Sequence, residues 1–71
     1  MRDVELNSEP IELYKILKFE GLVASGGEAK LVISNGGVLV NGAVETQKRK
    51  KIMSGDIIEF ADEKFRMQIK P

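Results

Sequence analysis

Two short stretches of this 71-residue chain carry residue types that can hold phosphate. The first is Lys-Arg-Lys-Lys at positions 48–51, a run of cations that no acid interrupts. Cations on a loop suit the phosphate oxygens of a nucleic acid, which take most of the contacts that position a bound protein. The alternative is that the run is solvated surface, as most charge runs are. The run therefore indicates nucleic-acid contact without deciding it.

The second stretch is Ser-Gly-Gly-Glu-Ala-Lys, which begins at Ser25. Ser25 followed by Glu28 is typical of a capping box at the start of a helix. The first turn of a helix has free N–H groups at the positive end of the dipole, and Gly26 and Gly27 have no side chain to keep a phosphate away from them. Lys30 follows one turn later and leans toward the helix start. The alternative is that the glycines only form a tight corner and Lys30 is solvated.

The residues that most enzymes and metal sites require are missing. The chain has no cysteine and no histidine, which excludes disulfides, common zinc and iron-sulfur ligands, thiol nucleophiles and imidazole acid-base chemistry. The carboxylates are scattered, and no glycine-rich phosphate motif follows a strand. A domain of this size also has little room for a substrate pocket. We therefore predict no catalysis, no metal, no cofactor and no small-molecule substrate.

Length and charge limit the other classes. A chain of 71 residues fits one small domain, here predicted to span residues 1–71. No apolar run approaches the ~18 residues that a membrane span needs, and the first ten residues do not resemble a secretory signal. We predict a cytoplasmic protein without a membrane partner. The formal net charge is zero, so a basic face requires the fold to gather cations that are separate in the sequence.

The first periodic segment predicts a helix over residues 10–20. Apolar side chains recur at the i, i+3, i+4 spacing of a helix with one buried face, namely Leu13, Ile16 and Leu17. Lys15 and Lys18 lie on the opposite side of the helical wheel. Ser8 or Glu9 is expected to cap this helix.

A second helix is expected to begin after Ser25. Residues 35–37, Asn-Gly-Gly, supply positions that adopt a positive φ and end it, as Gly21 is expected to end the first helix. The short segment 22–24 joins the two helices. The sequence therefore predicts a helical hairpin.

The period changes to two after Gly37, which indicates strands. Val38 and Val40 point to one side, and Asn41-Gly42 is a strong signal for a tight hairpin turn. Further strand signals cover residues 43–44, 57–60 and 65–69. The predicted fold class is α+β, with the two-helix hairpin packed on one face of a small, mainly antiparallel β-sheet. No aromatic pair lies near the basic run in the sequence, so we expect any nucleic-acid contact to recognise backbone and shape rather than sequence.

The stretch SGGEAKLVISNGGVLVNG, residues 25–42, resembles the pattern Ser-Arg-x-x-Ala, a short spacer and Gly-x-Val-x-Val-Asn-Gly. This is the pattern of the ribosomal-protein S-four-type RNA-binding domain, also called the alpha-L RNA-binding motif. ELYKILKFEGL resembles the first helix of that family and SGDIIEF its closing strand, so the likeness covers about residues 10–60. Gly26 replaces the usual arginine, and Glu12 and Tyr14 replace an arginine and an aspartate of the first helix. Glycines in place of that arginine and a basic loop after the hairpin resemble a subgroup of small stand-alone bacterial members.

The resemblance implies binding to structured RNA, commonly ribosomal or transfer RNA, with the ribosome or its assembly intermediates as candidate partners. The RNA-binding role of the family carries over, by position or by identity, to residues at the start of the second helix. One further lysine and the basic run are added because of their positive charge. The hypothesised RNA-binding residues are Lys18, Ser25, Gly26, Gly27, Lys30, Lys48, Arg49, Lys50 and Lys51. The alternative is a protein-interaction module, or a regulator on the same scaffold that has lost RNA binding.

Overall fold

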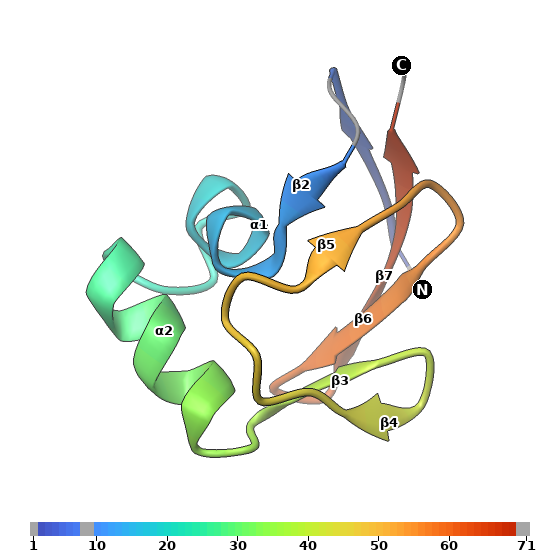
Figure 1. The fold of residues 1–71 in the computed structure, drawn as a ribbon. Coiled ribbons are helices and arrows are strands. Elements are labelled where there is room, and N and C mark those ends of the chain that lie inside the picture. The colour runs from blue at the N-terminus through green and yellow to red at the C-terminus, as the bar shows by residue number, and fades with distance from the viewer. Residues whose placement is uncertain (1, 8–9, 70–71) are drawn as a thin grey trace.

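A computed structural model describes residues 2–7 and 10–69 (Figure 1). Within these residues the elements are, in chain order, β1 (Arg2–Leu6), β2 (Ile11–Glu12), α1 (Leu13–Phe19), α2 (Gly26–Ser34), β3 (Val38–Val40), β4 (Ala43–Val44), β5 (Lys51–Ile52), β6 (Ile57–Phe60) and β7 (Glu63–Ile69). No helix in this part of the chain has the length and apolar character that crossing a membrane requires.

The strands form a five-stranded sheet and a separate two-stranded ladder. The sheet has the order β1-β7-β6-β3-β4, and its strand pairs are antiparallel except for β1 and β7. The ladder joins β2 to β5, with Ile11 opposite Ile52 and Glu12 opposite Lys51. The predicted class, an α+β fold with a mainly antiparallel sheet, is confirmed.

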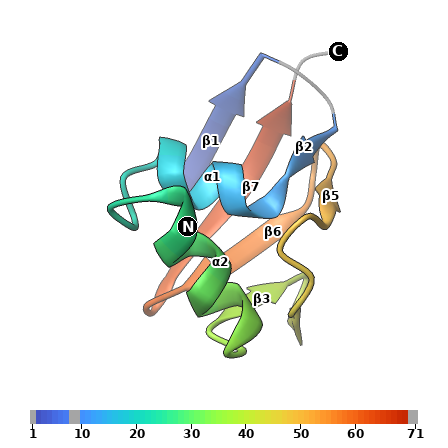
Figure 2. The same ribbon diagram turned by 60° about the vertical axis from the view of Figure 1, so that its left-hand side comes forward.

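Both helices lie on one face of the sheet (Figure 2). The core lies between the helices and the sheet. It is filled by apolar side chains that are almost completely buried, as the spacing within each element predicts. The helices contribute Leu13, Ile16, Leu17, Ala29 and Ile33, and the strands contribute Val4, Ile11, Val38, Val40, Ile52, Ile58, Phe65 and Met67. No polar or charged side chain is buried among the described residues. Charged groups are therefore confined to the surface.

The turns form where the sequence indicated them. Asn41 and Gly42 have φ angles of 53° and 86°, the left-handed pair that a two-residue hairpin requires. Gly21, with a φ of 68°, follows α1, and Gly36, with a φ of 80°, follows α2. Glycine has no Cβ to clash in this conformation, so it ends each helix at low cost.

The start of the first helix differs from the prediction. The helix begins at Leu13, because Ile11 and Glu12 pair with β5 instead. Glu12 occupies the N-cap position, but its side chain makes no capping hydrogen bond. The expected caps, Ser8 and Glu9, lie outside the described residues. Pairing with a strand that is distant in the sequence therefore decides the structure of residues that local periodicity assigned to the helix.

The order of elements also differs, since the chain begins with a strand rather than a helix. β1 pairs in parallel with β7, and Val4 lies opposite Met67. Only Val4 and Leu6 are apolar in this five-residue strand, a pattern too short to distinguish a strand from a polar leader. This strand is stabilised by its pairing with β7, which is near the other end of the chain.

Candidate nucleic-acid interface

The basic run 48–51 is attached to the start of α1 by its backbone. The N–H of Leu13 donates to the carbonyl of Lys50 at 2.9 Å, and the N–H of Tyr14 donates to the carbonyl of Lys48 at 3.1 Å. These are helix-start N–H groups, which need acceptors outside the helix. The loop carbonyls thus cap α1, while the side chains of residues 48–51 remain exposed. Backbone carbonyls, and not the charged side chains, therefore attach the run to α1.

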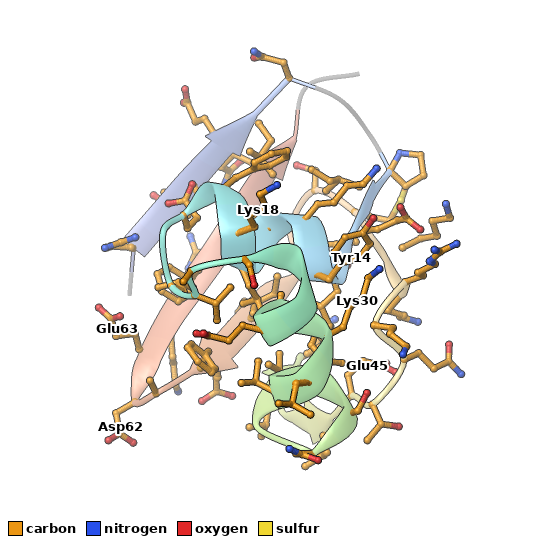
Figure 3. The ribbon with its side chains drawn as sticks, turned by 90° about the vertical axis from the view of Figure 1, so that its left-hand side faces the viewer. Tyr14, Lys18, Lys30, Glu45, Asp62 and Glu63 are labelled. Atoms are coloured by element: carbon orange, nitrogen blue, oxygen red, sulfur yellow. The ribbon has the colours of Figure 1, made fainter. Side chains whose placement is uncertain are left out.

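Tyr14 connects this loop to the start of α2. The ammonium of Lys30 lies 4.8 Å from the centroid of the Tyr14 ring, within the range of a cation-π interaction. A Cβ added to Gly26 would lie 3.9 Å from two carbons of the same ring, so the ring packs against the first residue of α2. Figure 3 shows Lys30 on α2 and Tyr14 and Lys18 on α1 facing the same side of the molecule.

One carboxylate lies between the loop and the helix. Glu12 places Oε1 3.3 Å from Lys15 Nζ and Oε2 3.9 Å from Arg49 Nε. Such partly exposed pairs contribute little stability, but they bring cations of α1 and of the loop to the same place. The surface here is basic with the Glu12 carboxylate embedded in it, and Figure 3 shows a second acid, Glu45, on the same side as Lys30.

The start of α2 has the cap that the sequence indicated. Ser25 Oγ accepts from the N–H of Glu28 at 3.2 Å, which confirms one half of the capping box. The Glu28 carboxylate accepts at 3.4 Å from the N–H of Ala24, one residue earlier than the usual partner. Within residues 2–7 and 10–69, the N–H groups of Gly26 and Gly27 have no acceptor. No carboxylate of the described residues accepts a hydrogen bond from them, although that of Glu28 lies at the same helix start.

The structure brings most of the candidate residues together around Tyr14. Ser25 caps α2, Gly26 and Gly27 begin it, and Lys30 lies one turn further on. Lys48, Arg49 and Lys50 lie on the docked loop, whereas Lys51, predicted as a loop residue, begins β5. Lys18 is exposed one turn further along α1, at the margin of this group. We call the set Lys15, Lys18, Lys30 and residues 48–51 the basic face. Asp62 and Glu63 lie at the opposite edge of the molecule in Figure 3.

Three residues of this region were missed by sequence reasoning about the site. Lys15 lies on the same side of the helical wheel as Lys18, so the charge argument that added Lys18 applies equally to Lys15. Glu12 and Tyr14 were noted only as departures from the family pattern. Their contacts depend on where β5 and α2 lie in space, and no local signal in the sequence indicates this.

The chemistry available here is anion binding. Lys30 and Gly26 both contact the Tyr14 ring, and the exposed cations of residues 48–51 follow the loop docked on the backbone of the same residue, an arrangement that suits phosphate. No group of three acidic, histidine or cysteine side chains within the described residues could hold a metal ion. The arrangement offers contacts to a polyanion through several separate cations.

Comparison with known proteins agrees with this geometry. Residues 4–68 match the family model of the S4 domain. The "Putative RNA-binding protein YbcJ" of Escherichia coli is 47% identical over 62 residues, which cover 86% of this chain and 89% of that protein. The "Probable ribosome maturation protein RlbA" of Bacillus subtilis is 34% identical over 57 residues, 80% of each chain.

Two solved structures share the fold. The solution structure of Escherichia coli YbcJ, described as having an alpha-L motif involved in RNA binding, matches with a TM-score of 0.71 and 42% identity over 96% of this chain and 87% of that one. The 30S ribosomal protein S4e of Thermoplasma acidophilum matches with a TM-score of 0.69 and 26% identity, over 84% of this chain and 32% of that one. The sequence match and the shared fold show that the chain belongs to the S4 domain family.

Proposed function

We propose that residues 1–71 act as one S4-type RNA-binding domain that holds structured RNA by its phosphates. The observation that carries this proposal is the docking of the basic run on α1 through the Lys48 and Lys50 carbonyls. The same docking holds the loop against Tyr14, whose ring contacts Lys30 and packs against Gly26, and this supports a shared phosphate-binding surface. The side chains of residues 48–51 are exposed and not needed for packing, so they are available to phosphates.

The relatives support ribosomal RNA as the ligand class. One relative is described as an RNA-binding protein, one as a ribosome maturation protein, and one structural neighbour is a ribosomal protein. We therefore favour ribosomal RNA, with transfer RNA second, and the ribosome or its assembly intermediates as the partner. Such a target would place the protein in the cytoplasm.

Each residue group has a distinct role in this proposal. Lys18, Lys30, Lys48, Arg49, Lys50 and Lys51 contact phosphates. Ser25 fixes the start of α2, and Gly26 and Gly27 admit one phosphate to their N–H groups. Phosphate contacts release counterions from the RNA, so binding weakens as salt rises. Neither an enzymatic reaction nor a small-molecule substrate is part of the proposal.

The test is a salt titration of ribosomal RNA binding by the wild type and by a variant with residues 48–51 all replaced by glutamine. Each lost contact lowers the slope of log K against log salt by about 0.7–0.9, so we expect a decrease of up to about three units. The melting temperature should change little, because the backbone anchors remain.

The control is Arg2→Gln with Lys64→Gln, which removes two cations paired to Glu20 and Glu59 outside the basic face. It should lower the slope by less than the matched double variant Lys48→Gln with Lys50→Gln. An unchanged titration of the four-residue variant would contradict the proposal. Partner binding that survives both ribonuclease and high salt would favour the protein-interaction module instead.

A further inference from the structure

A surface hollow of about 290 Å³ adjoins the basic face. Its lining comes from β2 and the residue before it, from α1 and from β5, and consists of Pro10, Ile11, Glu12, Lys15, Phe19 and Lys51. This volume is at the lower end of the range for small-molecule pockets, so it suits a group of the size of a nucleobase. Glu12 joins the hollow to the basic face, because the same carboxylate pairs with Arg49.

Phe19 is the feature of this hollow that the fold does not explain. Its side chain is 61% exposed, although the other face of α1 buries Leu13, Ile16 and Leu17 in the core. An exposed aromatic ring between lysines is the arrangement that stacks an unpaired base in single-stranded RNA recognition. Aliphatic lining alone would not provide a flat surface for such a base.

The charges of the hollow distinguish a base from a free phosphate. Glu12 lines it with a carboxylate that is paired with Lys15 and Arg49. Its remaining lone pairs accept N–H donors, which the edge of a base offers and a free phosphate does not. Lys15 and Lys51 are both exposed on the lining, where their ammonium groups can reach the phosphates on either side of that base. A nucleobase, which is uncharged and has a phosphate on either side, matches this arrangement of charges.

We propose that the hollow receives one unpaired base of the bound RNA, stacked on Phe19, with Lys15 and Lys51 on the adjacent phosphates. This inference rests on the RNA binding proposed above and makes it more specific. The preferred ligand is then a stem with a bulged or splayed nucleotide rather than a continuous duplex. Base contact is thereby added to the recognition of backbone and shape.

The test uses two RNA hairpins with the same stem and one bulged position, which carries adenine in one hairpin and an abasic sugar in the other. Wild-type protein should bind the adenine hairpin more tightly. Phe19→Ala should weaken binding to that hairpin by about 5- to 150-fold, the range for loss of one base stack, and should leave the abasic hairpin unaffected. In NMR spectra the ring current of the base should shift the Phe19 ring signals only with the adenine hairpin.

Leu31→Ala is the matched control, because Leu31 on α2 is also 61% exposed and lies outside the hollow. It should bind both hairpins as the wild type does. Equal wild-type affinity for the two hairpins, or equal weakening of both by Phe19→Ala, would overturn the inference. RNA binding itself would stand in that case if the four-residue loop variant still lowered the salt slope. Failure of the wild type to bind either hairpin or ribosomal RNA at low salt would overturn both.

Discussion

The connection from β4 to β5 and the connection from β6 to β7 join strands in different ways. The first covers residues 45–50, and the basic run begins within it. The second is the two-residue turn Ala61-Asp62, followed directly by Glu63. One connection is long and basic, and the other is tight and acidic.

The two connections are also stabilised differently. The long one is held by hydrogen bonds from α1 to its carbonyls and by Ile52, the fully buried second residue of β5. The short one depends on local backbone geometry, since Ala61 and Asp62 both have positive φ angles, 53° and 66°. Left-handed geometry costs a residue other than glycine about 1–2 kcal/mol. The turn is therefore strained, whereas the loop is anchored.

In the long connection, the charged side chains are therefore not the groups that stabilise the fold. The cations of the loop contribute no buried contact, because its backbone and Ile52 hold it in place. Their side chains can therefore serve a ligand, and changing them should leave the fold intact. In the acidic turn the backbone conformation itself is the cost, so changes there should alter stability and leave RNA binding unaffected.

The largest effect is expected when the anchor of the loop is removed. Ile52→Ala deletes a side chain with no exposed surface and should lower the free energy of unfolding by about 2–5 kcal/mol. Urea denaturation measures this loss, and the four-residue glutamine variant of the loop is the comparison. A cost of less than about 1 kcal/mol would contradict the view that the core holds the loop.

A gain in stability is expected when the strained turn is relieved. Asn41-Gly42 has nearly the same backbone angles as Ala61-Asp62 but uses the residues that tolerate them. Ala61→Asn together with Asp62→Gly should therefore stabilise the protein by about 1 kcal/mol, or about 4–8 °C in Tm for a domain of this size.

Thermal unfolding and RNA titration of the same turn variant test the comparison from both sides. Affinity for RNA should change much less than in the loop variants, since the turn lies at the opposite edge from Lys30 and Tyr14 (Figure 3). A lower Tm would mean that the Asp62 side chain contributes more than its backbone conformation costs.

The elements that could be predicted from the sequence are those with local signals. Ser25 and Glu28 indicated the start of α2, and Asn41-Gly42 indicated the hairpin after β3, because a cap and a tight turn depend on residues a few positions apart. The turn residues 54–56 indicated the start of β6, and alternation of apolar residues over 65–69 indicated β7, which in the structure begins earlier, at Glu63. The structure confirms each of these elements.

The elements that were missed depend on distant partners. β1 is completed by β7 at the other end of the chain, and residues 11–12 pair with β5 instead of beginning a helix. The site divides in the same way. The cation types were visible in the sequence, but Tyr14 gained its central place through hydrogen bonding with the loop and packing against Gly26. Local periodicity contains no information about such contacts.

The smallest expected effect concerns the glycines at the start of α2. Gly26→Ala with Gly27→Ala adds two methyl groups whose nearest neighbours are at 3.9 Å, an ordinary contact distance. The unfolded chain becomes less flexible, so we expect a gain of about 0.5–1 kcal/mol in stability. The methyl groups also obstruct the N–H groups, so RNA affinity should fall about two- to fivefold, in line with a helix-end contribution of about 0.3–1 kcal/mol.

An increase in stability together with a decrease in RNA affinity would distinguish a phosphate-binding role of these glycines from a purely structural one. If they only formed a tight corner against Tyr14, the alanines would either lower stability or leave affinity unchanged. Ser34→Ala is the control, because Ser34 donates to the Lys30 carbonyl at 2.8 Å at the far end of the same helix and leaves the first turn intact. Chemical denaturation and RNA titration of both variants at one low salt concentration decide whether a phosphate uses the N–H groups of Gly26 and Gly27. A stabilised protein with unchanged affinity would remove α2's first turn from the interface and leave binding to the cations alone.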